Sequence, residues 1–312
     1  MIDAVRTILR SQVWWLQLRE LQREGVAAAC RRLATQRAID RTPPIVTDRS
    51  GPAEVRVLTW RRDWRNAVWA LKSFYAYSGV RYPLYLHDGG WLEWQELELR
   101  RHFPTAIFVG KAESDRVVES WLEEREYERS LAYRRKNGVT RKLFDFFLMS
   151  QAEYVITLDS DLLFFRSPRE LLQPSIREAR NLYARDSAYF YSMTLDELED
   201  AIGIRPKPYF NPGPSLASRR SIDFALIERS LQQPKMFDDK WVTEQTLHAL
   251  CGSAHGADYF PDSYVIDPRP GRLDEVICKH YPGRYRDRLY TEGMPQLLQQ
   301  GFIERLHALA AH

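Results

Sequence analysis

A chain of 312 residues with 44% hydrophobic and 28% charged residues has the composition of a globular protein of one large or two small domains. A net charge of +3, without any Lys/Arg run interleaved with aromatic residues, argues against a nucleic-acid partner. The three cysteines are widely spaced and form no disulfide or zinc pattern, and the sequence has neither a signal peptide nor a bilayer-spanning stretch, so we expect a cytoplasmic protein.

Residues 1–41 have the pattern of an amphipathic helical segment. Apolar residues recur at helical spacing from Ile2 to Leu16, with Trp14 and Trp15 beside them and arginines between. Such a helix packs on its own domain or on a second copy, or it lies on an anionic membrane surface. The pattern favours packing and leaves peripheral contact with the inner face of the membrane as the alternative.

Breakers on both sides of a short polar segment predict a linker over residues 42–54. They are Thr42-Pro43-Pro44 and Ser50-Gly51-Pro52. The main domain is therefore expected over residues 55–312.

From residue 55 onward, strand and helix patterns alternate. Strands are predicted over residues 55–60, 83–87, 106–109 and 154–158, and helices over residues 66–77, 91–103, 115–135 and 140–151. This alternation predicts an α/β sheet.

The fourth predicted strand ends in a pair of carboxylates, Asp159 and Asp161. Side chains at i and i+2 of a strand point to the same face, so both carboxylates can converge on one cation. Hard oxygen ligands suit Mg²⁺ or Mn²⁺ holding a diphosphate. The alternative is an acidic turn or a helix N-cap after a core strand.

Other polar residues follow the carboxyl ends of predicted strands, which is where open α/β sheets bind ligands. Thr59 and Trp60 follow the first strand, and Asp88 follows the second. We therefore expect these residues to share one site with the two carboxylates.

Six short motifs occur in a fixed order along residues 55–290: Val57-Leu58-Thr59, Lys142-Leu143, Leu158-Asp159-Ser160-Asp161, Phe210-Asn211-Pro212-Gly213, Glu244-Gln245 and His280-Tyr281-Pro282-Gly283. This order resembles that of the GT-A glycosyltransferases, in particular the retaining group that includes glycogenin and bacterial lipopolysaccharide galactosyl- and glucosyltransferases. The resemblance implies a Rossmann-like mixed sheet flanked by helices, with residues 1–41 as an N-terminal helical extension. It also implies a nucleotide half over about residues 55–165 and an acceptor half over about residues 166–290.

The resemblance further implies roles for the residues of the motifs. Those for a metal are Asp159, Asp161 and His280; those for the nucleotide-sugar donor are Thr59, Trp60, Asp88, Lys142, Asp159, Gly283 and Arg286; those for catalysis are Glu244, Gln245 and Asn211. Glu244 would act as base, nucleophile or positioning carboxylate. The sequence departs from the family pattern at Arg286, where the family has Lys, and at Pro212, where it usually has Ser.

The expected function is a metal-dependent hexosyltransferase of polysaccharide biosynthesis. Its cofactor would be Mn²⁺ or Mg²⁺, its donor a UDP-sugar and its acceptor a glycan or glycolipid, with retention at the anomeric carbon. Trp241, Tyr264 and Tyr285 could stack on an acceptor sugar or belong to the core.

Two other functions stay open. One is a haloacid dehalogenase-like phosphatase, which also carries Asp-x-Asp after a strand and could draw on Lys235 and Asp238-Asp239. The other is a catalytically silent protein that uses the same pocket to bind a nucleotide or a carbohydrate.

Overall fold

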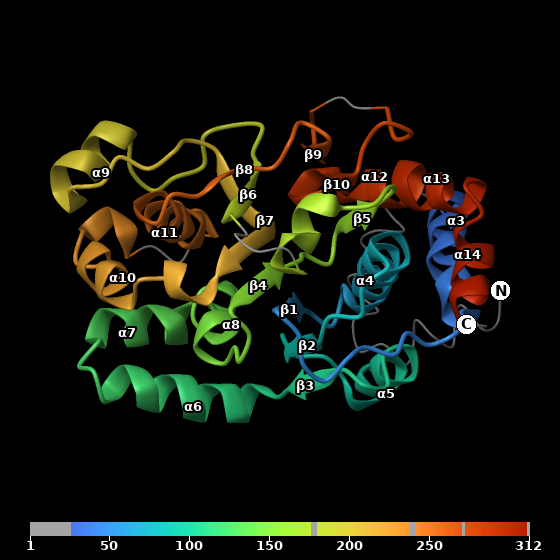
Figure 1. Ribbon diagram of the computed structural model, residues 1–312, viewed down its shortest axis with the longest axis horizontal. Coiled ribbons are helices and arrows are strands. Elements are labelled where there is room, and N and C mark those ends of the chain that lie inside the picture. Colours follow the sequence, from blue (N-terminus) through green and yellow to red (C-terminus); the bar gives the residue numbers. More distant parts are fainter. Residues whose placement is uncertain (1–25, 176–179, 238–240, 270–271, 311–312) are drawn as a thin grey trace.

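The computed structural model describes residues 26–175, 180–237, 241–269 and 272–310. The strands of these residues form a sheet of seven strands and a sheet of three (Figure 1). The larger sheet has the order β3-β2-β1-β4-β7-β6-β8, made of β1 (Ala53–Thr59), β2 (Leu84–Asp88), β3 (Ile107–Val109), β4 (Tyr154–Thr157), β6 (Leu182–Arg185), β7 (Phe210–Ser218) and β8 (Asp258–Tyr259). Strands β1 to β4 pair in parallel, whereas β7 is antiparallel to both β4 and β6, so the sheet is mixed.

The four strands predicted for the first half are all present. The largest difference lies at β1, which begins at Ala53 instead of residue 55. The first two predicted helices are also present, as α4 (Trp64–Ser78) and α5 (Glu93–His102).

The helix predicted over residues 115–135 is instead two helices, α6 (Lys111–Glu123) and α7 (Glu128–Lys136). The chain reverses between them, with Glu126 at a φ of 57°. The helix predicted over residues 140–151 was also wrong. A 3₁₀ turn, η2 (Gly138–Lys142), and the four-residue α8 (Asp145–Leu148) take its place, and ion pairs from Arg141 to Asp115 of α6 and to Asp145 of α8 hold that turn.

The second half continues the same sheet through β7, β6 and β8. Its helical elements are η3 (Arg169–Ser175), α9 (Leu195–Ile202), η4 (Arg219–Ser221), α10 (Phe224–Ser230), η5 (Pro234–Met236) and α11 (Trp241–Ala254). The smaller sheet has the order β5-β10-β9, made of β5 (Leu162–Phe164), β9 (Tyr264–Ile266) and β10 (Cys278–His280).

The last described elements pack near the first. They are η6 (Gly283–Tyr285), α12 (Arg286–Arg288), the π-helix η7 (Leu289–Gly293), α13 (Met294–Gln299) and α14 (Phe302–Ala310). Helix α3 (Val26–Arg37), which leads into the 3₁₀ turn η1 (Ala38–Arg41), lies beside α13 and η7 (Figure 1). The rest of the predicted N-terminal helix, with Trp14 and Trp15, lies outside the described residues.

The segment predicted as a linker packs against the domain. The Ile45 amide donates to the His102 carbonyl at 2.9 Å, and the Thr47 amide donates to the Thr105 hydroxyl at 2.7 Å. Ile45 and Thr47 are buried, so this segment covers α5.

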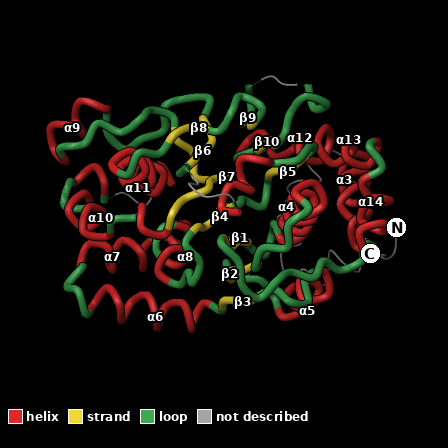
Figure 2. Tube along the Cα trace, in the orientation of Figure 1, coloured by secondary structure: helices red, strands yellow, loops and turns green. Residues whose placement is uncertain are grey.

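Helices cover both faces of the large sheet, as the tube in Figure 2 shows. Val57 of β1 and Ile156 of β4 face the apolar cluster around α4, α13 and α14, whereas Leu58 and Val155, their chain neighbours, face the cluster around α8, α10 and α11. This alternation is the period of two that a strand between two helical layers requires. The predicted fold class, an α/β protein with a mixed sheet flanked by helices, is confirmed.

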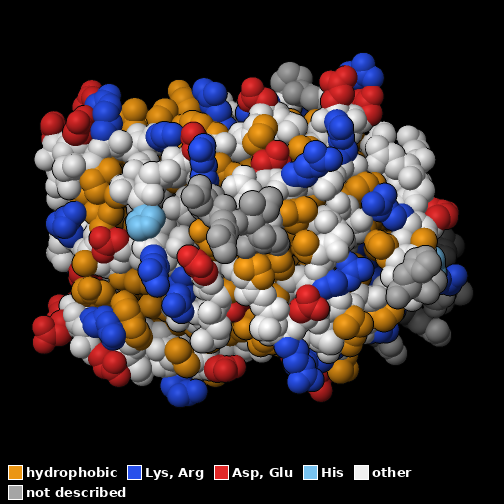
Figure 3. Space-filling view, viewed as in Figure 1, with side chains coloured by type: hydrophobic (Ala, Val, Ile, Leu, Met, Phe, Trp, Pro, Cys, Tyr) orange, Lys and Arg blue, Asp and Glu red, His pale blue; other side chains and the backbone are white. Residues whose placement is uncertain are grey.

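No described helix has the length and apolarity to cross a bilayer. On the face that Figure 3 presents, acidic and basic side chains are interspersed and do not gather into one basic patch.

Candidate active site

Asp159 and Asp161 lie between β4 and β5, and the pairing of β5 brings His280 to them. Leu162 of β5 pairs with His280 of β10 in antiparallel register, and the Tyr281 amide donates to the Asp161 carbonyl at 2.8 Å. Two segments more than a hundred residues apart in the chain thus meet at one end of the sheet.

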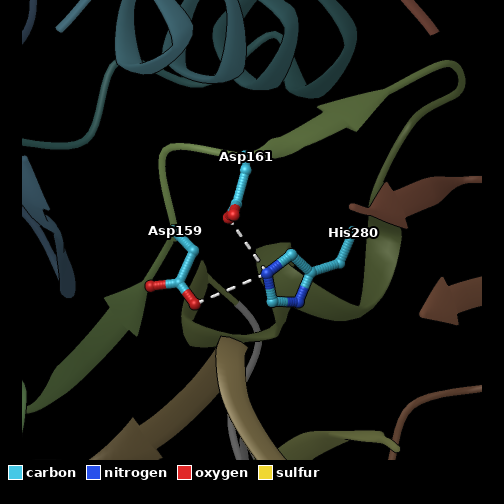
Figure 4. Close-up of side chains that lie close together, drawn as sticks. All are labelled: Asp159, Asp161 and His280. Carbon is cyan, nitrogen blue, oxygen red and sulfur yellow. Dashed lines mark hydrogen bonds and ion pairs between the residues drawn. The ribbon is translucent and has the colours of Figure 1, made fainter. Parts of the chain in front are cut away.

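The three side chains point toward one another (Figure 4). His280 Nε2 lies 3.0 Å from Asp161 Oδ1 and 3.7 Å from Asp159 Oδ2. One ligand atom from each residue falls within 4.8 Å of the others, and Asp161 and His280 are buried. Two carboxylates and an imidazole at this spacing fit a divalent cation such as Mn²⁺.

Two cationic side chains also reach the carboxylates. Lys142 Nζ donates to Asp159 Oδ1 at 2.7 Å, and Arg286 Nη2 donates to Asp161 Oδ2 at 2.6 Å. Asp161 therefore takes part in side-chain pairs, and among the described helices none is capped by either carboxylate. Of the alternative given for this motif, an acidic turn or a helix N-cap, the N-cap is wrong, whereas Ser160 and Asp161 do lie in a turn.

Burial and charge act in opposite directions on these groups. Burial lowers the pKa of Lys142, but the neighbouring carboxylates of Asp159 and Glu244 outweigh it, so the pKa is raised. Burial raises the pKa of Asp161, but His280 and Arg286 outweigh it, so the pKa is lowered. The pKa of His280 is raised by Asp161 against the effect of burial. Asp161 is therefore ionised and Lys142 protonated at neutral pH.

Gly213 of β7 makes room for Asp159. A Cβ built on Gly213 would lie 2.5 Å from the carboxyl carbon of Asp159 and overlap its oxygen. The Gly213 amide donates to Asn211 Oδ1 at 3.0 Å, and Asn211 Nδ2 donates to Asp186 Oδ2 at 2.9 Å. The Asn-x-Gly motif thus places its backbone directly against the acidic pair.

Glu244 and Gln245 lie in the first turn of α11, and both are buried. Gln245 Nε2 donates to Asp186 Oδ2 at 3.4 Å, so Asp186 orients the amides of both Asn211 and Gln245. Glu244 Oε1 lies 3.1 Å from Nε2 of His248, one helical turn on.

A cavity of about 740 Å³ contains most of the predicted site. The predicted residues that line it are Trp60, Lys142, Asp159, Asp161, Asn211, Glu244, Gln245, His280, Gly283 and Arg286. Trp241 and Tyr285 line it too, whereas Tyr264 is a buried core residue of β9 whose hydroxyl donates to Glu170. Of the two alternatives for Tyr264, the structure bears out the core residue and not the stacking surface, because its ring packs on Phe260.

Two predicted donor residues do not line the cavity, although their neighbours do. Thr59 is fully buried at the end of β1. Asp88 Oδ1 accepts the amides of Gly90 and Trp91 and so closes the turn after β2. The Thr59 carbonyl accepts the Gly89 amide of that turn at 3.0 Å, so both residues hold the backbone next to Trp60.

Trp60 lines the cavity, and its ring packs closely against the backbone of Gly89 and Gly138. A Cβ on Gly89 or on Gly138 would come within 2.8 Å of the indole. The ring is 38% exposed, so one flat apolar surface faces the cavity.

Lys235, one of the residues that a phosphatase could draw on, does not line this cavity. Lys235 pairs with Glu197 on the surface at 2.5 Å. Asp238 and Asp239 lie outside the described residues.

Three carboxylates of the cavity were not predicted from the sequence. Asp63, at the start of α4, pairs with Arg286, and Asp186, after β6, holds Asn211 and Gln245. Asp267, directly after β9, pairs with Lys279 and Arg288. The only signal for these residues is an Asp at the end of a strand or the start of a helix, which is common without function.

No protein-family model and no curated protein matches this sequence. The chain is similar to several solved structures. Mouse xyloside xylosyltransferase 1 matches with a TM-score of 0.49 and 15% identity, over 74% of this chain and 97% of that one. The galactosyltransferase LgtC, in complex with donor and acceptor sugar analogs, matches with a TM-score of 0.49 and 15% identity, over 78% of this chain and 95% of that one. The mannosyltransferase Ktr4p from S. cerevisiae, in complex with GDP, matches with a TM-score of 0.44 and 11% identity, over 73% of this chain and 78% of that one.

Proposed function

We propose that this chain is a metal-dependent glycosyltransferase that moves a sugar from a nucleotide-sugar donor, a UDP-sugar in the first instance, to a glycan or lipid-linked acceptor. The observation that carries the proposal is the convergence of Asp159, Asp161 and His280 within 4.8 Å in a cavity of about 740 Å³. A cavity of this volume is large enough for a nucleotide-sugar.

The proposed metal ligands and the cationic side chains beside them explain how a sugar–phosphate bond could be broken here. A divalent cation held by Asp159, Asp161 and His280 would neutralise the charge that develops on the departing nucleoside diphosphate. Lys142 and Arg286 would add fixed positive charge beside the phosphates. Trp60 offers its exposed ring face to the base.

The sugar would lie against α11 and β7. Glu244 is the carboxylate that would serve the attacking hydroxyl as base or the anomeric carbon as nucleophile. Gln245 and Asn211 turn their amide nitrogens to Asp186, which leaves the Gln245 carbonyl oxygen to accept from a sugar hydroxyl. Retention at the anomeric carbon follows from the resemblance of the motifs and belongs to the proposal.

The acceptor would enter past aromatic side chains. Phe190 and Trp241 have ring centroids 5.1 Å apart, and Trp241 is 48% exposed. Together with Tyr285 these rings could cover the apolar face of a sugar. Contact with a membrane surface, or with a second copy, through residues 1–41 remains part of the proposal.

Calorimetric titration of UDP, with GDP in parallel, tests the site with and without Mn²⁺. We expect Mn²⁺-dependent binding that is lost in Asp161→Asn and kept in Asp262→Asn, which removes an exposed carboxylate paired with Arg269. Thermal unfolding of both variants controls for folding. Absence of binding of both nucleotides to the unsubstituted protein would overturn the proposal.

Turnover separates an enzyme from a silent binding protein. Slow release of UDP from a UDP-sugar, dependent on Mn²⁺ and lost in Glu244→Gln, is expected of a transferase. Tight binding of every donor tested without release of nucleotide would favour the silent binding protein.

A further inference from the structure

Arg286 is shared between two carboxylates that come from different parts of the chain. Its Nε and Nη2 donate to Asp161 Oδ2 at 3.2 and 2.6 Å, and its Nη1 donates to Asp63 Oδ1 at 3.1 Å and to Asp63 Oδ2 at 3.3 Å. The guanidinium fork thus has one edge on the predicted metal ligand and the other on Asp63. All three side chains line the cavity.

The side chain of Asp63 does not cap α4, although Asp63 lies at the N-terminus of that helix. An Asp at an N-cap normally accepts an amide of the first helical turn, but the Asp63 side chain makes no such bond to α4. Its carboxylate is 7% exposed and turns toward Arg286. A helix cap therefore does not account for an acidic residue at this position.

Arg286 and a divalent cation would compete for the carboxylate of Asp161. One Asp161 oxygen lies 3.0 Å from His280 Nε2, on the side of the proposed metal site, and the other accepts the short bond from Arg286. Two positive charges on one carboxylate repel each other, so a cation weakens the hold of Asp161 on Arg286. Once the cation is bound, Asp63 is the partner that could keep Arg286 beside the cavity.

We propose that Asp63 is a positioning residue that holds Arg286 by one edge, so that binding of the cation frees the other edge of the guanidinium for the phosphates of the donor. The proposal rests on the metal site of the proposed function and deepens it. A lysine ammonium is a point charge and lacks the two hydrogen-bonding edges of a guanidinium. Arg286 and Asp63 would therefore act together.

Two consequences distinguish this positioning role from a direct electrostatic effect of Asp63 on the cation. Without Asp63, Arg286 pairs with Asp161 alone and competes more strongly with the cation, so Mn²⁺ binds more weakly. Without Arg286, the competition disappears, and Asp63 no longer influences the cation through it.

The test is a double-mutant cycle read by Mn²⁺ binding, with Asp63→Asn, Arg286→Met and the double variant titrated by calorimetry in the absence of nucleotide. We expect Asp63→Asn to weaken Mn²⁺ binding on the order of fivefold, within the range of coupling between contacting charged groups. Arg286→Met is expected to bind Mn²⁺ at least as tightly as the unsubstituted protein and UDP more weakly, and the double variant should equal Arg286→Met. Asp40→Asn is the matched control, because Asp40 pairs with Arg65 near the start of the same helix.

Each outcome of the cycle distinguishes a positioning role of Asp63 from its action as a distant charge. An Asp63→Asn effect of the same size with and without Arg286 would reduce Asp63 to a distant charge and overturn the positioning role, as would no effect at all. Asp63→Glu, which keeps the carboxylate, should restore Mn²⁺ affinity and serves if Asp63→Asn does not fold. Absence of Mn²⁺ binding to the unsubstituted protein would overturn the metal site itself, and this role with it.

Discussion

The Asp159 carboxylate lies against the backbone of Gly213, so closely that any side chain at position 213 would overlap it. This contact joins the loop after β4 to β7, its antiparallel neighbour in the sheet. Asp159 also accepts the bond from Lys142 and lies 3.7 Å from His280 Nε2. The position of one proposed metal ligand therefore depends on the absence of a Cβ in the strand beside it.

Gly213→Ala should displace Asp159 and weaken Mn²⁺ binding. We expect a loss of about 10- to 100-fold, the range typical for groups that orient a metal ligand. Calorimetric titration of Mn²⁺ checks this. Gly110→Ala is the control, because a Cβ on Gly110 meets no atom within 4 Å and the residue has an ordinary φ of −68°. Unchanged Mn²⁺ affinity in Gly213→Ala would show that Asp159 does not act as a ligand from this position.

The sequence predicted the strand β4 and the acidic pair that follows it. The apolar run of β4 follows local rules, but Asp159 and Asp161 lie in the turn between β4 and β5, so that turn, and not the periodicity of a strand, brings their carboxylates together. His280 was predicted only through the order of the motifs. Its approach depends on the pairing of β5 with β10, which no local pattern specifies.

Long-range pairs account for what the sequence did not predict. Asp63 and Arg286 are 223 residues apart, so the order of the motifs assigned a role to Arg286 but gave no sign of its pairing with Asp63. The helix predicted over residues 140–151 is replaced by η2 and α8, and within η2 Arg141 and Lys142 pair with carboxylates on other segments, Asp115 and Asp159, which no local pattern specifies.

Arg134→Met should destabilise the protein far more than Arg135→Met. Arg134 is 1% exposed and donates to Asp145, which is fully buried, whereas Arg135 is 53% exposed. Removing one partner of a buried ion pair costs about 3–5 kcal/mol, because the other charge stays buried. Denaturant unfolding of the two variants measures the difference.

The two arginines are matched, since they are neighbours on α7 and both pair with Glu119. The free energy of unfolding of Arg135→Met should stay close to that of the unsubstituted protein. Arg141, in the turn that presents Lys142, shares Asp145 with Arg134, so Arg134→Met should also weaken nucleotide binding. Equal stability of the two variants would contradict a structural role for this cluster.

Lys72 should give the protein a pH-dependent stability that is unrelated to the site. Its ammonium is buried and donates to the Thr42 hydroxyl at 2.7 Å and to the Pro43 carbonyl at 2.6 Å. Burial, with a smaller contribution from Arg101, lowers the pKa of Lys72 to about 7 from 10.5.

Between those two values the unfolded chain binds a proton at Lys72 that the folded protein has released. Stability therefore rises with pH over this window, by at most about 1.4 kcal/mol per pH unit from this group. Below about pH 7 both states are protonated and the contribution no longer changes. Urea unfolding of the unsubstituted protein from pH 7 to 9 should show this rise, and Lys72→Met should remove it. Lys111→Met, at an exposed lysine at the start of α6, should keep the rise, and a slope that Lys72→Met leaves intact would assign the effect to another group.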